Sequence, residues 1–324
     1  MTQATAQTPS EAASQSAVSL YALDPAMPVL LRPDGAVQVG WDPRRAVLVR
    51  PPGGLAAPEL AALLRSMRSP TPLSELRRRA VDRGLRDGPS ASQGLTALVA
   101  QLVGAGVATE CRQPQGRAAA IRIHGRGPLS ELLTDALRRS GARVGHSSQP
   151  HAAVSPAAVD LVVLSDTLVA DPRMVRDLHA LGVPHLPVRV RDGTGLVGPL
   201  VIPGVTSCLG CADLHRADRD AAWPAIAAQL RDTVGVADRA TLLATAALAL
   251  SQINRVIAAV RGRQAVPDPA PPPALNATLE FDVNAGSIVA RRWTRHPLCA
   301  LCPCGGPRGR AVAGSTARRA GRHG

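Results

Sequence analysis

Residues 119–139 read AAIRIHGRGPLSELLTDALRR, and this stretch decides the fold class. Ala119, Ile121 and Ile123 recur at every second position, which predicts a strand. Leucines at helical spacing predict a helix from Pro128 onward, and two glycines join the strand to it. A strand that enters a helix through glycines is the opening unit of a doubly wound α/β domain.

Strands and helices continue to alternate after this unit. The apolar pattern predicts strands at residues 142–144, 160–164 and 184–190 and a helix at 172–181. This alternation predicts a parallel sheet with helices on its faces. The later segments are expected to form helices at 222–230 and 239–261, a proline-rich linker at 267–273 and a hairpin over 275–293. We therefore predict a Rossmann-like domain over residues 117–304.

Residues 25–112 follow a different pattern. Short apolar runs around an Asp34-Gly35 turn predict a small antiparallel sheet within residues 28–49. Apolar residues at three- and four-residue spacing predict three helices, at 58–67, 73–83 and 92–104. Together these elements predict a winged-helix-like α+β module. The flanking residues 1–24 and the arginine-rich residues 305–324 are expected to be disordered.

The composition excludes some chemistry. The chain has 324 residues, a net charge of +13 and no lysine, so all 37 of its Lys and Arg residues are arginines. A Schiff-base lysine and a P-loop lysine are therefore excluded. Such a charge is typical of proteins that bind nucleic acid, but the aromatic share of 2% leaves few side chains on which bases could stack. Nucleic acid is not an expected partner.

The apolar runs are short. We expect none to reach the roughly 18 residues that span a bilayer, because the longest, residues 240–250, is followed by polar positions. The N-terminus lacks the basic start and apolar core of a secretory signal. We therefore expect a cytoplasmic protein with no membrane partner.

Three residues are candidates for a nucleotide site. Gly125 and Gly127 lie in the turn where a glycine-rich loop would bind phosphates at a helix N-terminus. The third glycine of that motif is missing, and residues 144–149 offer no acid for the ribose. Asp166 follows a strand and could hold a magnesium ion. We interpret this set as a vestigial nucleotide site, and ATP is not an expected cofactor.

The cysteines form the strongest motif. Cys208 and Cys211 are spaced C-x-x-C, and Cys299 and Cys302 repeat that spacing, with Cys304 two residues later. Two such pairs can supply four thiolates to one tetrahedral zinc ion, and a fully ligated zinc is structural. The fourth ligand is either Cys302 or Cys304. The alternatives are a disulfide and a redox-active C-x-x-C, which normally begins a helix after a strand.

Several motifs carry a resemblance to a known family. They are the run over residues 198–204, the C-x-x-C at Cys208, the following Asp213-Leu214-His215-Arg216, the Trp223-Pro224 pair and the ending that contains His296-Pro297. The chain resembles the ThiF-like (ubiquitin-activating-enzyme-like) superfamily. Within it, the chain looks like the leader-peptide-binding cyclodehydratase branch of thiazole/oxazole-modified peptide (TOMM, bacteriocin) biosynthesis.

The resemblance implies a division of labour. An N-terminal element would bind the leader of a precursor peptide by adding it as a strand. The ThiF-like domain would be a scaffold braced by zinc, with Cys208, Cys211, Cys299 and Cys302 as ligands. A separate or fused YcaO-type enzyme would perform the ATP-dependent cyclisation.

The leading hypothesis is therefore a non-catalytic, zinc-containing scaffold that binds a leader peptide and partners a YcaO-type enzyme. We expect the peptide along an edge strand in the region of Val37, Val39, Val47 and Val49, because edge strands accept an extended chain by main-chain pairing. A homodimer is left open as a further assembly.

Two other functions are kept as alternatives. The first is an ATP-dependent adenylating enzyme that activates a peptide carboxylate, with Arg126 or another arginine in place of lysine. The second is a winged-helix DNA-binding protein, whose affinity would fall steeply with salt.

Overall fold

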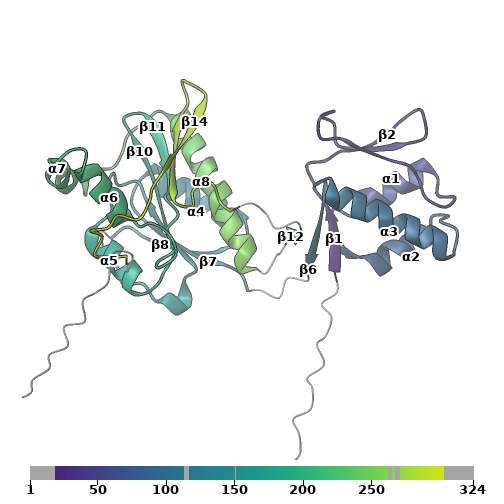
Figure 1. Ribbon diagram of the computed structural model, residues 1–324, viewed down its shortest axis with the longest axis horizontal. Coiled ribbons are helices and arrows are strands. Elements are labelled where there is room, and N and C mark those ends of the chain that lie inside the picture. The colour runs from purple at the N-terminus through teal and green to yellow at the C-terminus, as the bar shows by residue number, and fades with distance from the viewer. Residues whose placement is uncertain (1–18, 113–116, 150, 262–264, 267–270, 303–324) are drawn as a thin grey trace, which may run out of the picture. The chain divides into compact units, whose positions relative to one another are not determined.

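The structure is a computed structural model that describes residues 19–112, 117–149, 151–261, 265–266 and 271–302. The chain divides into two compact units (Figure 1). Unit 1 comprises residues 1–119 and 253–271, and unit 2 comprises residues 120–252 and 272–324. The predicted module over residues 25–112 therefore lies within a unit that also takes in residues 253–271. The chain returns to unit 1 because β12 (Ala265–Val266) pairs antiparallel with β6 (Ala108–Arg112).

Unit 1 contains a four-stranded sheet in the order β12-β6-β1-β5. Its strand β1 (Ser19–Leu23) pairs antiparallel with β6 on one side and with β5 (Thr71–Pro72) on the other. We expected residues 1–24 to be disordered, and this is wrong for residues 19–23. Leu20 and Leu23 are buried, and this burial holds β1 within the sheet. Residues 1–18 and 305–324 lie outside the described residues.

A second, three-stranded sheet of unit 1 has the order β2-β3-β4. It consists of β2 (Val29–Leu31), β3 (Val37–Val39) and β4 (Val47–Val49), as the sequence predicted. The three predicted helices are also present, as α1 (Ala57–Ser66), α2 (Leu73–Val81) and α3 (Pro89–Gly104). One face of the sheet packs with these helices into a core that includes Val37, Val39, Leu60, Leu64, Leu76, Leu95 and Leu102.

Unit 2 is built on a seven-stranded sheet in the order β14-β13-β11-β10-β9-β7-β8. The strands β8 (Arg143–Ser147), β7 (Ala120–His124), β9 (Leu161–Ser165) and β10 (His185–Arg191) are parallel. The strands β11 (Thr194–Val197), β13 (Ala277–Asp282) and β14 (Ser287–Arg292) extend the sheet with antiparallel pairings. The sheet is therefore mixed rather than fully parallel, and β11 was not predicted.

Helices cover both faces of this sheet, as expected for a Rossmann-like fold. The helices of unit 2 are α4 (Pro128–Arg139), α5 (Pro172–Ala180), α6 (Leu209–Ala217), α7 (Trp223–Leu230) and the part of α8 (Arg239–Val260) up to residue 252, with a short 3-10 turn η1 (Pro156–Ala158). On one face, Met174 and Leu178 of α5 pack on Val162 and Leu164 of β9. On the other face, α8 approaches the backbone of β11 at Gly195.

The helix α8 is longer and more apolar than we expected of any segment. It has 22 residues, and its most apolar 18-residue window has a mean hydropathy of 1.5, which is long and apolar enough to cross a membrane. Its buried face, however, packs within the unit. Thr245 fills the space beside Gly195, and Gln252 accepts a hydrogen bond from the N–H of Ala274. About one third of the most apolar window is buried by contacts of this kind.

Candidate functional site

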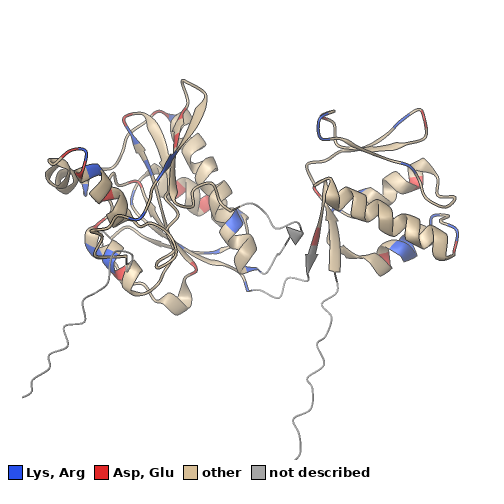
Figure 2. Cartoon of the chain, viewed as in Figure 1, with Lys and Arg blue, Asp and Glu red and all other residues tan. Residues whose placement is uncertain are grey.

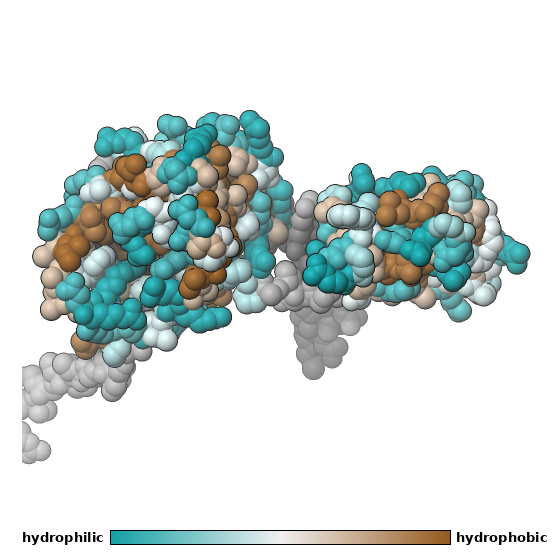
Figure 3. Space-filling view, turned by 90° about the horizontal axis from the view of Figure 1, so that it is seen from above, coloured by the Kyte–Doolittle hydropathy of each residue, from teal (hydrophilic) through white to brown (hydrophobic). Residues whose placement is uncertain are grey.

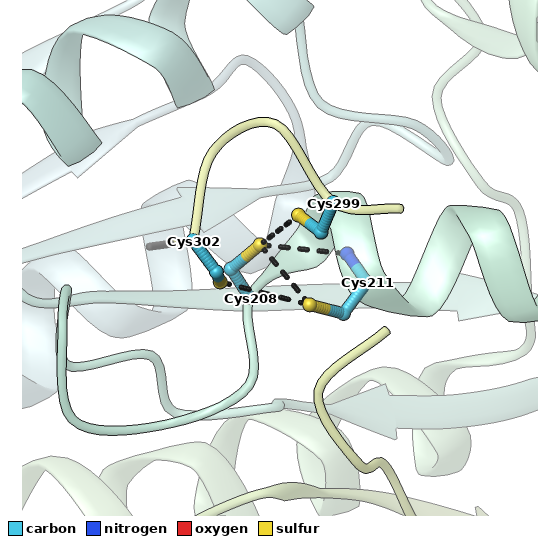
Figure 4. A group of neighbouring side chains, drawn as sticks. All are labelled: Cys208, Cys211, Cys299 and Cys302. Atoms are coloured by element: carbon cyan, nitrogen blue, oxygen red, sulfur yellow. Dashed lines mark hydrogen bonds between the residues drawn. The ribbon is translucent and has the colours of Figure 1, made fainter. Parts of the chain in front are cut away.

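Four cysteines converge in unit 2. Cys208 lies at the N-terminus of α6, Cys211 lies in its first turn, and Cys299 and Cys302 lie in the segment after β14 (Figure 4). Their sulfur atoms point toward one another, at 3.7 Å for Cys208–Cys211, 3.4 Å for Cys208–Cys299 and 3.6 Å for Cys211–Cys302. All four side chains are buried. The predicted pairs thus meet, although 91 residues separate them.

These distances distinguish a metal site from a disulfide. Disulfide sulfurs lie about 2.05 Å apart, whereas four thiolates at about 2.3 Å from a tetrahedral zinc ion lie about 3.8 Å from one another. The donor set and geometry therefore fit zinc with no open coordination position. Burial raises the pKa of the Cys208 thiol to about 12, so in the folded chain it needs a cation to become a thiolate.

The C-x-x-C begins a helix, as a redox-active motif normally does. The Cys208 sulfur caps α6 and accepts the N–H of Cys211 at 3.4 Å. What favours a metal is instead the arrival of Cys299 and Cys302 at the same point. Cys304 lies outside the described residues, so Cys302 is the fourth ligand that the structure brings together with the others.

Histidine side chains brace the segment that carries the second cysteine pair. The Nδ1 atom of His296 accepts the N–H of Leu298 at 3.1 Å, and its Nε2 lies 2.9 Å from a carboxylate oxygen of Asp218. The carbonyl of His296 accepts the N–H of Cys299. His215, on α6, contacts the backbone of Thr294 at 3.1 Å. These histidines therefore tie the segment after β14, which carries Cys299 and Cys302, to α6 and the residue that follows it.

The three residues of the predicted nucleotide site, Gly125, Gly127 and Asp166, also come together, but the carboxylate of Asp166 already has partners in the first turn of α4. The carboxylate of Asp166 accepts hydrogen bonds from the N–H groups of Leu129 at 2.9 Å and Ser130 at 3.1 Å, and from the Ser130 hydroxyl. These groups form the N-terminus of α4, where a phosphate would bind in a nucleotide-binding domain. The protein's own carboxylate therefore occupies the anion position.

The glycines have a packing role at this place. A Cβ atom at Gly127 would lie 2.7 Å from a carboxylate oxygen of Asp166, and one at Gly125 would collide with the backbone of Ser165. Both positions must therefore lack a side chain for the end of β9 to approach α4. In this structure, Gly125 and Gly127 admit Asp166 to the helix N-terminus.

The predicted peptide-binding region needs a partial correction. β3 is the middle strand of its sheet, paired with β2 on one side and β4 on the other. Val37 and Val39 are fully buried, and their strand is no edge. Val49 is also buried, and Val47 packs against the same core. The alternating valines of β3 therefore belong to the core of unit 1. An extended peptide would need an edge strand, which has backbone groups free to pair with it.

Each edge strand of this sheet has outward backbone groups, and those of β4 are the first to consider. The N–H of Gly40 donates to the carbonyl of Pro28 at 2.8 Å, which makes these two residues a hydrogen-bonded pair. In an antiparallel sheet every second pair is hydrogen-bonded, so the next such pair between β2 and β3 is Leu30 with Gln38. Gln38 therefore bonds toward β2, and its neighbours in β3 bond toward β4. It follows that the N–H and C=O of Leu48 point away from β3, at the free edge of the sheet.

The opposite edge is partly occupied. The guanidinium of Arg65 donates to the backbone carbonyl of Val29 in β2 at 2.8 Å. Among the described residues, none provides such a bond to Leu48. Apolar residues gather on the face of unit 1 that carries this sheet (Figure 3). The exposed apolar side chains of this part of the chain are Leu30 and Leu31 in β2, Leu48 in β4 and Trp41 between β3 and β4. The most accessible edge is therefore β4, beside exposed apolar side chains.

Sequence reasoning did not find a further feature, a cavity in unit 2. It is lined by Arg189 of β10, Arg216 of α6, Trp223 of α7 and Trp293, with other residues of the sheet and helices. The signal in the sequence was Arg189 between two valines of β10, whose sequence is HLPVRVR, but periodicity alone does not show what lies opposite it. Basic and acidic positions are otherwise interspersed over each unit (Figure 2).

Comparison with known proteins identifies the fold. No protein-family model matches the chain, and no curated protein matches it. Among solved structures, the heterocyclase TruD is similar with a TM-score of 0.58 and 15% identity, over 88% of this chain and 43% of TruD. A heterocyclase in complex with substrate and cofactor is similar with a TM-score of 0.59 and 15% identity, over 87% of this chain and 39% of that one.

A third similar structure is Escherichia coli MccB, which was solved with ATP. It has a TM-score of 0.51 and 12% identity, over 87% of this chain and 99% of MccB. The chain thus spans less than half of the heterocyclases and nearly all of MccB. These matches show that the chain has the fold shared by TruD and MccB.

Proposed function

We propose that this chain is a non-catalytic scaffold that binds an extended precursor peptide on unit 1 and presents it to a separate, YcaO-type peptide-modifying enzyme. The observation that carries the proposal is the free edge at Leu48, beside an exposed apolar face. An edge strand binds an extended chain through main-chain hydrogen bonds, and neighbouring side chains select its sequence. The likeness to a heterocyclase solved in complex with substrate and cofactor supports a fold that binds a substrate, and the free strand edge is what favours an extended peptide.

The state of the nucleotide site supports a non-catalytic role. Asp166 occupies the helix N-terminus on which a phosphate would bind. A nucleotide would have to displace a carboxylate held by two backbone donors and a hydroxyl, and it would meet no lysine in this chain. The occupied helix N-terminus and the missing lysine both weaken nucleotide binding at this one site. A separate enzyme is therefore the simpler source of ATP-dependent chemistry.

The four-cysteine site supports a structural role for zinc. A zinc ion held by four thiolates has no position for substrate or water, so it cannot act as a Lewis acid on a reactant. It would instead join α6 to the segment after β14. We therefore assign zinc to the folding of unit 2.

The proposal is tested with the full chain purified with zinc. Overlapping synthetic peptides that cover the small open reading frames beside this gene are titrated into it by calorimetry, and Mg-ATP is titrated separately. We expect one leader segment to bind and Mg-ATP to give no heat of binding. Binding of Mg-ATP together with exchange of pyrophosphate would contradict the non-catalytic assignment.

The alternative is an ATP-dependent adenylating enzyme that activates a peptide carboxylate. The likeness to MccB, solved with ATP, favours this alternative. It requires the Asp166 carboxylate to leave the N-terminus of α4 when the nucleotide binds. Pyrophosphate exchange that depends on a peptide would support it.

A further inference from the structure

The cavity in unit 2 has a volume of about 710 Å³. Its floor is one face of the sheet. The register pairs Arg189 of β10 with Leu196 of β11, and Leu196 with Glu280 of β13, so these three side chains lie on the same face. Residues of α5, α6 and α7 complete the walls. A volume of roughly 300–1,000 Å³ is typical of sites for small ligands.

Arg189 is the unusual residue of this cavity. It lies in the middle of the sheet, where its backbone pairs with Leu196, and its guanidinium makes no hydrogen bond or ion pair among the described residues. Desolvation by burial lowers the pKa of this guanidinium to about 10; the neighbouring Arg216 lowers it further, and the charges of Asp213 and Glu280 offset only part of this shift. A cation in such a place is costly unless an anion pairs with it.

The acids of the cavity are engaged with other partners. Asp213 bonds to Arg216 at 2.8 Å and accepts the indole N–H of Trp223 at 3.2 Å. Glu280 bonds to Arg291 at 2.8 Å. The remaining acid, Asp220, accepts a backbone N–H. Against these three acids the lining has seven arginines, so the cavity retains an excess of positive charge around Arg189.

The rest of the lining is apolar and aromatic. The guanidinium of Arg216 lies 5.1 Å from the ring centroid of Trp223 and 4.8 Å from that of Trp293, which holds the two rings in place by cation–π contacts. Leucines from three elements complete this surface, namely Leu196, Leu209 and Leu230. A ligand that fits must therefore combine a negative group with an apolar body.

We propose that this cavity binds a small carboxylate ligand, with the carboxylate paired to Arg189 and an apolar body against the surface of Trp223 and Trp293. The planar guanidinium offers two parallel donors that match the two oxygens of a carboxylate. This site lies within unit 2 and does not depend on peptide binding by β4. A failure of either proposal therefore leaves the other intact.

The test compares three probes on the full, zinc-loaded chain at constant ionic strength. N-acetyl-L-phenylalanine supplies a carboxylate on an apolar body, its amide lacks the charge, and phenyl phosphate supplies a different anion. Dissociation constants come from ligand-observed NMR titrations. We expect the carboxylate to bind at least about tenfold more tightly than the amide. Equal binding of acid and amide, or tighter binding of phenyl phosphate, would overturn the proposal.

The location of the site is tested with variants. Arg189→Met removes the guanidinium, and Arg189→Gln is a second variant that keeps a polar side chain. The matched control is Arg219→Gln, which removes an arginine from the same lining. We expect both Arg189 variants to weaken binding of the carboxylate at least about tenfold and the control to retain it. Unchanged binding by a folded Arg189 variant would overturn the assignment.

A stability measurement separates this role from a structural one. Because the guanidinium of Arg189 makes no ion pair among the described residues, the melting temperature of Arg189→Met without added ligand should equal or exceed that of the unmodified chain. Addition of N-acetyl-L-phenylalanine should raise the melting temperature of the unmodified chain and not that of the variant. A lower melting temperature for the variant without ligand would indicate that Arg189 supports the fold.

Discussion

The carboxylate of Asp166 accepts a hydrogen bond from the backbone N–H of Leu129, with 2.9 Å between oxygen and nitrogen. The two residues are 37 positions apart, and the bond joins the end of β9 to the first turn of α4. A side chain thus binds where a nucleotide phosphate would otherwise bind. This contact is central to whether the chain is a scaffold or an adenylating enzyme.

The first prediction concerns the stability of this contact. Asp166→Ala leaves two buried N–H donors of α4 without a partner, and we expect the free energy of unfolding to fall by about 3 kcal/mol. Asp166→Asn should cost about 1 kcal/mol, because Asn retains an acceptor oxygen and tolerates the positive φ of 71° at this residue. Urea unfolding measures both.

Asp171 provides a matched comparison, because it caps α5 through one backbone N–H, that of Arg173. Asp171→Ala should cost only about 1 kcal/mol. If Asp166→Ala were no more destabilising than Asp171→Ala, the carboxylate would not be holding α4 as described.

The second prediction concerns the metal. We expect one zinc ion per chain by elemental analysis, because the four described cysteines form one tetrahedral set. Cys302→Ser should abolish zinc binding and lower the melting temperature strongly, because the sulfur of Cys302 lies 3.6 Å from that of Cys211. The matched control is Cys304→Ser, which should keep zinc. The reverse result would make Cys304 the fourth ligand.

The third prediction concerns the peptide-binding edge. Leu48→Pro removes the outward N–H of β4, and we expect it to weaken binding of the leader peptide at least about tenfold. Leu31→Pro removes the outward N–H on the opposite edge and serves as the control, since both leucines are 51% exposed. Calorimetry on both full-length variants measures the effect. Loss of binding in Leu31→Pro alone would place the peptide on β2.

The fourth prediction concerns pH. Burial lowers the pKa of His185 to about 4 from 6.5, and its Nε2 has no partner among the described residues. As the pH falls, the side chain of His185 is therefore protonated at a higher pH in the unfolded chain than in the folded chain. The stability that comes from the neutral histidine is complete above pH 6.5 and is lost between that value and about 4.

Comparison with a variant isolates this effect. From pH 7 to pH 5 the loss from His185 should be about 2 kcal/mol. His185→Leu should lose that much less stability over the same range, as measured by urea unfolding at each pH. Release of zinc at low pH affects both chains equally, so the difference between them reports on the histidine. An identical pH dependence would contradict the assigned pKa.

The sequence predicted much of the local structure. The strand-glycine-helix unit that begins at residue 119 is present, and the predicted helices over 58–67, 73–83 and 172–181 correspond to α1, α2 and α5. These predictions succeeded because apolar periodicity reflects which side of an element is buried. The strand β11 and the helix α6 were missed, because the first is short and the second begins at Cys208 and contains Cys211, which were interpreted only as ligands.

The candidate sites were predicted less evenly. The cysteine spacing identified the ligand pairs, since C-x-x-C is itself a local geometry. The peptide-binding edge was predicted at valines that pack against the core. Alternating apolar residues identify the core face of a sheet but do not show which strand lies at its edge. The position of Arg189 in a cavity was not predicted for a similar reason, because the helices that pack opposite it form the rest of the cavity wall.

The sequence by itself determined the alternation of elements, the absence of lysine chemistry and the presence of two cysteine pairs. Each is a property of composition or of residues a few positions apart. Only the tertiary structure decided that the pairs meet, that Asp166 occupies the N-terminus of α4, that β4 is the free edge and that Arg189 faces a cavity. These relationships join segments far apart in the chain, and they depend on strand order and packing, which local patterns do not specify.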